Sequence, residues 1–198
     1  MSTIRAKVSD SHLHVRVKSC GMTPASTSAP PTLEPISLEP ISLEPTLPDV
    51  HLVTLGSHQL LVNGEPVRLD AGRARTCEVI AFMLEFGPAQ IIDLREGIFP
   101  DRLPVLARDY FHQIRKAVHK AIPGLKFPFD PAFRLYTVDS SEVRLRWDVQ
   151  EVRDALALGG EVGRQRARAL FSGSFMPGSE LLWVQELRDE LKWAGLEP

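Results

Sequence analysis

The segment from Pro104 to Ala121 constrains this chain more than any other, because its apolar and basic residues separate at helical spacing. A helix turns by about 100° per residue, and on such a helix one side is apolar. That side consists of Ala107, Phe111, Ile114, Val118 and Ala121, with Tyr110 at its edge. A stripe roughly 130° away consists of Arg108, His112, Arg115 and His119, with Lys116 beside it. Such a helix can pack on a core and present a cationic ridge to the DNA major groove. A solvated charged face is the alternative interpretation.

Charge along the chain favours a local basic surface over a general one. The chain has 198 residues and a formal net charge of −2, so it is not an indiscriminate polyanion binder. Residues 102–126 nevertheless contain six Lys and Arg residues and one acid, Asp109. The basic charge is therefore concentrated around the candidate reading helix.

The two cysteines, Cys20 and Cys77, form neither a CxxC pair nor a disulfide framework. No apolar run approaches the roughly 18 residues that would suggest a membrane span. The N-terminus also lacks the pattern of a signal peptide. We therefore expect a cytoplasmic protein with reduced thiols and no membrane partner.

Residues 1–49 differ in composition from the rest of the chain. Residues 23–48 are rich in Pro, Ser, Thr and Glu, with LEPIS, LEPIS and LEPTL in succession. Regularly spaced prolines remove backbone donors, which predicts a disordered, Pro-rich extension. His12, His14 and His51 are too few and too scattered for a metal site, and we expect neither a metal nor a cofactor.

A globular domain is predicted over residues 50–147. A strand and an Asn63-Gly64 hairpin come first, at residues 51–56 and 59–69. Helices are then expected at Arg73–Phe86, at about 91–99 and at 104–121, followed by short strands at 127–130 and 132–138 and a last strand, VRLRW. This order is typical of a winged helix, in which the third helix enters the major groove and the final ribbon touches the flanking backbone.

Three segments of this domain carry a resemblance to a known class. They are the strand VTLG, the hairpin that ends in VRL and the segment AFRLYTV, in that order. The domain resembles the winged helix of response regulators of the OmpR/PhoB class. HQIRKAV resembles the reading helix of that class, with Ile114, Arg115 and Lys116 at its aliphatic and two basic positions. The turn Phe129–Phe133 departs from the Gly-x-Gly-Tyr type that is usual in the wing.

Residues 148–198 carry a second motif. WDVQEVRDALA precedes RARALFSGSFMPGSELLWVQELRDEL, which resembles the start of a bacterial transcriptional activator domain. The residues that match are Asp148, Phe171, Gly173, Phe175, Met176, Pro177, Trp183 and Arg188. A winged helix followed by this domain is the arrangement of the Streptomyces antibiotic regulatory protein family, which the chain resembles over roughly residues 50–193.

This resemblance implies an α+β fold: a winged helix-turn-helix with a small N-terminal antiparallel sheet, followed by a short all-α C-terminal unit. It also implies a non-enzymatic transcription regulator that binds double-stranded DNA in a sequence-specific manner. The C-terminal helices would then form a shelf for a second protomer in a homodimer, or for RNA polymerase.

The candidate DNA contacts lie mainly on the reading helix. Arg115 is the best candidate for a base or phosphate contact, given its position in the class. Arg108 and His112 lie on the same ridge, nearer the N-terminus, where reading helices meet bases. Lys116 and His119 are expected to meet phosphates.

Further basic residues flank this helix. Arg102 and Lys126 lie just outside it, and Arg134 on the wing would reach the minor groove or the backbone, with surface decoration as the alternative. Arg73 and Arg75 begin the first helix, where a cation opposes the helix dipole. A DNA phosphate would relieve that conflict, and ordinary solvation is the alternative.

Enzymatic motifs are absent from the sequence. It has no G-x-S-x-G, H-E-x-x-H or Walker loop, and its acidic residues are scattered, so no catalytic residue is expected. The tryptophans Trp147, Trp183 and Trp193 are expected to pack within the C-terminal unit. The alternative function is a protein–protein interaction module whose degenerate winged helix no longer binds DNA, with LLWVQELRDELKWAG as its surface.

Overall fold

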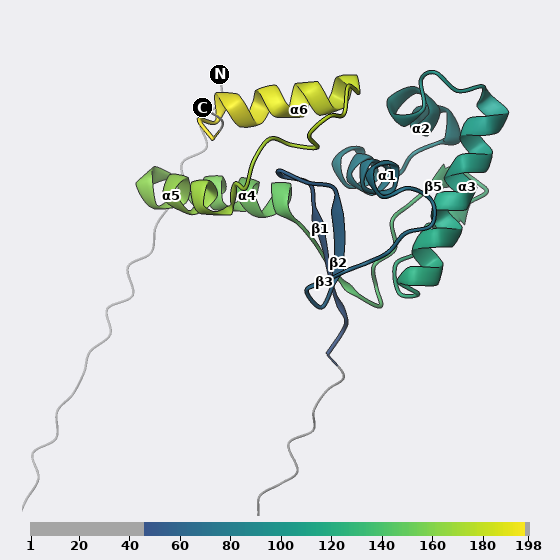
Figure 1. Ribbon diagram of the computed structural model, residues 1–198, viewed down its shortest axis with the longest axis horizontal. Coiled ribbons are helices and arrows are strands. Elements are labelled where there is room, and N and C mark those ends of the chain that lie inside the picture. The colour runs from purple at the N-terminus through teal and green to yellow at the C-terminus, as the bar shows by residue number, and fades with distance from the viewer. Residues whose placement is uncertain (1–45, 197–198) are drawn as a thin grey trace, which may run out of the picture. The chain divides into compact units, whose positions relative to one another are not determined.

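The computed structural model describes residues 46–196, which lie in the compact unit Leu43–Pro198 (Figure 1). The predicted disordered extension, 1–49, falls almost wholly outside the described residues, as do His12, His14 and Cys20. The last residue of that range, Asp49, already belongs to the first strand.

A four-stranded sheet begins the fold. Its strands are β1 (Asp49–Val53), β2 (Gln59–Val62), β3 (Glu65–Pro66) and β6 (Arg144–Trp147), in the order β3-β2-β1-β6. The first three are antiparallel, as expected, and Asn63 and Gly64 turn the hairpin with φ of 51° and 85°. Positive φ at both positions matches the right-handed twist of paired strands. The last predicted strand, VRLRW, is confirmed as β6, but its parallel pairing with β1 was not predicted.

The three predicted helices are confirmed. They are α1 (Arg73–Phe86), α2 (Ile91–Ile98) and α3 (Pro104–Ala121). A glycine in the left-handed region, Gly87 with φ of 81°, follows α1, and Pro104 opens α3 where a missing N–H costs nothing. The backbone N–H of Gln90 donates to the Asp93 carboxylate at 2.7 Å, which caps α2.

The wing is shorter than predicted. It consists of β4 (Phe129–Asp130) and β5 (Leu135–Tyr136), which pair antiparallel. Pro128 and Pro131 flank β4 and have no N–H to extend the ladder. An isolated bridge between Ala89 and Tyr136 ties the wing to the segment between α1 and α2.

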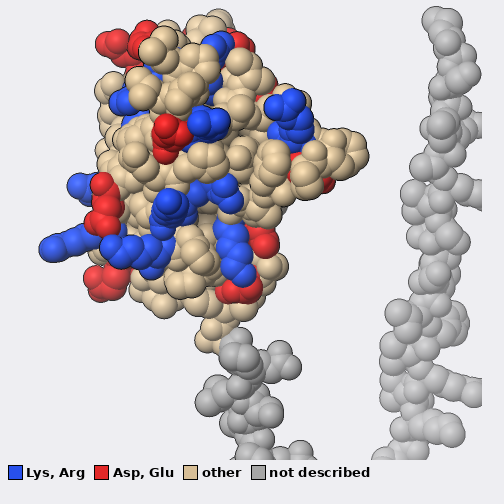
Figure 2. Space-filling view, turned by 90° about the vertical axis from the view of Figure 1, so that its right-hand side faces the viewer, with Lys and Arg blue, Asp and Glu red and all other residues tan. Residues whose placement is uncertain are grey.

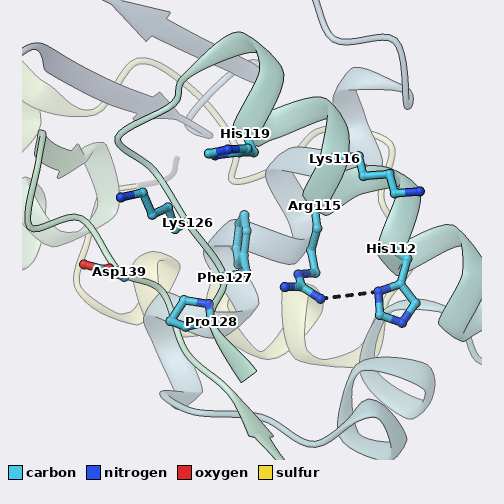
Figure 3. A pocket seen from close by; sticks show the side chains of 8 residues that line it. All are labelled: His112, Arg115, Lys116, His119, Lys126, Phe127, Pro128 and Asp139. Atoms are coloured by element: carbon cyan, nitrogen blue, oxygen red, sulfur yellow. Dashed lines mark hydrogen bonds between the residues drawn. The ribbon is translucent and has the colours of Figure 1, made fainter. Parts of the chain in front are cut away.

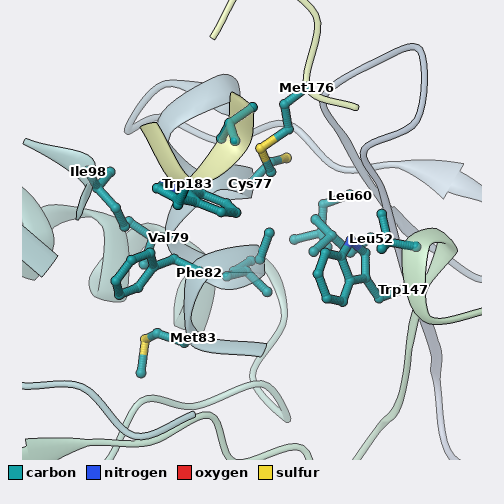
Figure 4. Close-up of a cluster of buried hydrophobic side chains, with 14 of the residues drawn as sticks. Leu52, Leu60, Cys77, Val79, Phe82, Met83, Ile98, Trp147, Met176 and Trp183 are labelled. Atoms are coloured by element: carbon teal, nitrogen blue, oxygen red, sulfur yellow. The ribbon is translucent and has the colours of Figure 1, made fainter. Parts of the chain in front are cut away.

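Helix α1 lies at the centre of the core and is buried over eight consecutive residues, Thr76 to Met83 (Figure 4). The apolar face of α3 is buried as predicted, at Ala107, Phe111, Ile114 and Val118. Burial also raises the pKa of the Cys77 thiol to about 12, so this cysteine is held as an unreactive thiol.

The C-terminal helices are α4 (Asp148–Ala157), α5 (Gly160–Leu170) and α6 (Leu182–Trp193). They share the core of the winged helix: the Trp183 ring lies 5.6 Å from that of Phe82, and its indole N–H donates to the Gly97 carbonyl at 3.1 Å. Arg153 adds an ionic link, because it donates to Glu85 of α1 at 2.7 Å and to Glu190 of α6 at 3.0 Å.

The tryptophan prediction holds in two cases out of three. Trp147 and Trp183 are buried, whereas Trp193 is 89% exposed. The prediction for Trp193 is wrong for a geometric reason. Trp183, Leu187 and Leu191 follow at four-residue spacing and face the core. A residue two positions beyond Leu191 lies about 200° around the helix from it, on the opposite face.

Candidate nucleic-acid interface

The exposed face of α3 carries the predicted basic stripe. Arg108, Lys116 and His119 are exposed, while His112 and Arg115 are half-buried. Figure 2, which looks onto the side of the molecule that carries α3, shows Lys and Arg side chains grouped together with acidic groups mostly at the margins. Since the opposite face of α3 is buried, the helix is positioned to present this stripe outward.

Arg115 is oriented by its neighbours. Its guanidinium lies over the ring of Tyr136 on β5, 5.0 Å from the centroid, and its Nη1 lies 3.4 Å from Nδ1 of His112 (Figure 3). Burial, followed by the charges of Arg115 and Arg108, lowers the pKa of His112. A neutral His112 can accept the Arg115 N–H at Nδ1, so Arg115 is held between α3 and the wing.

A cavity of about 410 Å³ lies between α3 and the chain leading into the wing. Its lining residues, labelled in Figure 3, are His112, Arg115, Lys116, His119, Lys126, Phe127, Pro128 and Asp139. Lys126 is paired with Glu142, and this hydrogen bond raises the Lys126 pKa. In the described part of the chain Lys116 makes no ion pair, so its charge is available to an external anion.

At the N-terminal end of α3 the basic residues are only loosely held. Arg108 lies 3.4 Å from Asp109, and both are more than half exposed, so this pair is weak. Arg102 lies over the Tyr110 ring at 4.7 Å, which places it beside the first turns of α3. The Tyr110 hydroxyl donates to the Ala71 carbonyl at 2.9 Å and fixes that platform.

The two arginines at the start of α1 differ in their contacts. Arg75 donates to Glu78 at 2.7 Å and to the Ile98 carbonyl at 3.0 Å, so a protein carboxylate supplies its anion. Arg73 is exposed, next to the N-cap Gly72, which provides no side-chain cap. Arg134 is exposed on the wing loop, with φ of 56°.

Three aromatic residues of the wing were missed as candidate functional residues. Tyr136 supports Arg115, and its ring also lies 4.9 Å from that of Phe111 and 4.8 Å from that of Phe129. Phe133 is 69% exposed at the wing turn. In the sequence, the only sign of these residues was that the turn departs from the pattern usual in the class. That departure showed a difference but did not predict a function for the aromatic side chains.

Other kinds of site find no support in the described residues. Within residues 46–196 no cluster of His, Cys, Asp and Glu could hold a metal ion. No helix in this range is long and apolar enough to cross a membrane.

No family model and no curated protein matches this chain. Among solved structures, it is similar to Mycobacterium tuberculosis EmbR in complex with a low-affinity phosphopeptide, at 18% identity and a TM-score of 0.51. The match covers 74% of this chain and 42% of the EmbR chain, so this chain corresponds to less than half of that protein. At this identity the likeness concerns the fold alone: the chain has the α+β architecture of a winged helix joined to a short all-α unit.

Proposed function

We propose that this protein is a non-enzymatic transcription regulator that binds duplex DNA in a sequence-specific manner. The main support for this proposal is that α3 has two distinct faces. Its apolar face is buried, and its outer face carries Arg108, His112, Arg115, Lys116 and His119. In a winged helix this is the helix that enters the major groove, while the wing contacts the flanking backbone.

The role of each basic side chain in this proposal follows from its place on α3 or the wing and from the contacts that hold it. Arg115, held on Tyr136, reads a base with little loss of side-chain freedom, and Arg108 and His112 read bases nearer the helix N-terminus. Lys116 and His119 contact phosphates. Arg102, Arg134 and Arg73 contribute flanking backbone contacts, Arg134 from the wing.

The remaining parts of the chain serve this activity in the proposal. Residues 50–147 form the DNA-binding domain, and residues 148–198 form a helical shelf for a second protomer or for RNA polymerase. The protein works in the cytoplasm of its cell. No cofactor takes part.

The direct test is a salt titration of the full chain against pooled genomic duplex fragments, with sequencing of the retained DNA. Enrichment of one motif, with an affinity that falls as salt rises, is the expected result, because phosphate contacts release counterions. Weak binding without enrichment would contradict sequence specificity. Absence of binding at low salt would contradict the proposed function altogether.

A charge-reversal pair locates the interface. Arg115→Glu with Lys116→Glu should abolish duplex binding and keep the helical circular dichroism signal. The matched control is Arg166→Glu with Arg168→Glu, two exposed arginines on α5. Equal loss in both double variants would indicate a general charge effect and not a reading helix.

The second candidate function is a protein–protein interaction module. It is favoured by exposed apolar side chains on α6, where Leu182 is 72% exposed and Trp193 is 89% exposed. This version predicts a stable complex with a protein partner, no salt-dependent affinity for DNA, and loss of the complex in Trp193→Ala. Retention of DNA binding by the full chain would argue against it.

A further inference from the structure

The wing turn exposes two large aromatic residues. Phe133 is 69% exposed in the loop of four residues between β4 and β5, and Phe129 is 45% exposed on β4 itself. Exposed single apolar residues are ordinary, but two phenylalanines together at the end of a ribbon form a projecting apolar tip. The wing tip comprises residues Phe129 to Arg134.

The wing tip is held in one conformation. Oδ1 of Asp130 accepts the backbone N–H of Ala132 at 2.8 Å and that of Phe133 at 3.4 Å. Pro131 restricts the turn further, and Arg134 adopts a left-handed backbone with φ of 56°. Phe133 is therefore presented by an ordered loop, and little conformational entropy is lost when it is buried by a partner.

The wing tip is continuous with the proposed DNA surface. The Phe129 ring lies 4.8 Å from Tyr136, and Tyr136 lies under Arg115 of α3. The contacts thus run from the reading helix through the base of the wing to the tip. A duplex held by α3 therefore meets the wing in its adjacent groove, and Arg134 beside Phe133 adds a positive charge that suits the minor groove.

We propose that Phe133 acts as an apolar wedge that enters the minor groove, partly unstacks one base step and bends the duplex. Apolar side chains inserted in this way kink DNA by about 20–90°. Flexible pyrimidine–purine steps are the preferred position, because they unstack most easily. This inference rests on the proposed function, and it adds a preference for deformable sequence at a position that α3 does not touch.

The test uses the full chain and the duplex retained from pooled genomic DNA. Fluorophores at the two duplex ends report bending by energy transfer, and 2-aminopurine placed at successive steps reports unstacking. We expect a bend and a 2-aminopurine increase at one step with the native chain. In Phe133→Ala both should be lost and affinity should fall about tenfold. Phe133→Leu, which keeps an apolar wedge, should retain most of both.

The matched control is Leu47→Ala, which removes an exposed apolar side chain just before β1, outside the proposed interfaces. It should bend and bind DNA like the native chain. If the native chain binds DNA without bending it, or if Phe133→Ala bends DNA as the native chain does, the proposed insertion of Phe133 is wrong. Neither outcome contradicts the proposed function. A native chain that binds no DNA overturns both. Because Phe133 is exposed, its variants test recognition without unfolding the protein.

Discussion

The buried carboxylate of Asp148 accepts two hydrogen bonds from Thr54, one from its backbone N–H and one from its hydroxyl, both at 2.7 Å. The same carboxylate accepts the backbone N–H groups of Leu55 at 2.7 Å and Val149 at 2.9 Å. It thus joins the end of β1 to the first turn of α4, where a negative charge also favours the helix dipole. One side chain therefore fastens the helical unit to the sheet.

Asp148→Ala should lower the free energy of unfolding by about 3 kcal/mol, because it leaves buried N–H and O–H donors without an acceptor. Asp148 is only 6% exposed, so water cannot easily replace the carboxylate. Urea unfolding measures the change. The control is Asp154→Ala, an exposed residue of the same helix, which should change stability by less than about 0.5 kcal/mol. Equal effects of the two substitutions would contradict the anchoring role.

Gly97→Ala should destabilise the protein by about 1–3 kcal/mol through overpacking. A Cβ at this position would lie 2.4 Å from Cε2 of Phe82, and Phe82 itself packs against Trp183. Thermal melting measures the loss, and the near-ultraviolet signal of Trp183 should change with it. Glu96→Ala, an exposed neighbour, is the control and should melt like the native protein. A native melting curve for Gly97→Ala would show that Phe82 can move aside.

Lys116→Ala and Arg115→Ala should weaken DNA binding in different ways. Removing a phosphate contact weakens all sequences alike and lowers the salt slope by about one, which we expect for Lys116. Removing a base contact relaxes specificity by about 1–3 kcal/mol, which we expect for Arg115. Binding isotherms at several salt concentrations separate the two, with Lys192→Ala on α6 as control. Identical profiles for both variants would contradict these roles.

His58 makes stability depend on pH. Burial is the main cause that lowers its pKa from the ordinary value of 6.5, and its Nε2 has no hydrogen-bond partner in the described part of the chain. The folded state disfavours the charged form of the His58 ring. The stability that a neutral His58 contributes is therefore fully present above pH 6.5 and is lost as the pH falls through the lowered pKa. The melting temperature should therefore fall between about pH 8 and pH 5, and less steeply in His58→Gln. An unchanged slope in that variant would exclude His58, leaving His112, whose pKa is shifted in the same direction.

The helices were predictable because their signals are local. Gly87-Pro88 ends α1, Pro104 opens α3, and the period of Phe111, Ile114 and Val118 sets which face of α3 is buried. The exposure of Trp193 could also have been predicted, since its phase relative to Leu191 opposes the core.

The pairing of β6 and the direction of Arg115 depend on contacts distant in sequence. VRLRW has the alternation of a strand, but no local turn specifies its parallel partner β1. The contact of Arg115 with Tyr136 requires the wing to be placed first. The sequence therefore predicted which residues form the exposed basic stripe of α3. It did not predict that the wing holds Arg115 in place.

The parallel pairing of β1 with β6 has a consequence for biosynthesis. Thr54 and Asp148 are 94 residues apart, so the central strand lacks its neighbour until nearly the whole winged helix has been translated. At about 5–20 residues per second, β1 waits roughly 5–20 s with one edge unpaired. The hairpin and the helices can form early, but the four-stranded sheet is completed only when β6 pairs with β1. A ribosome-bound chain truncated before β6 should therefore be sensitive to protease and prone to aggregation, while one that extends past α4 should be protected.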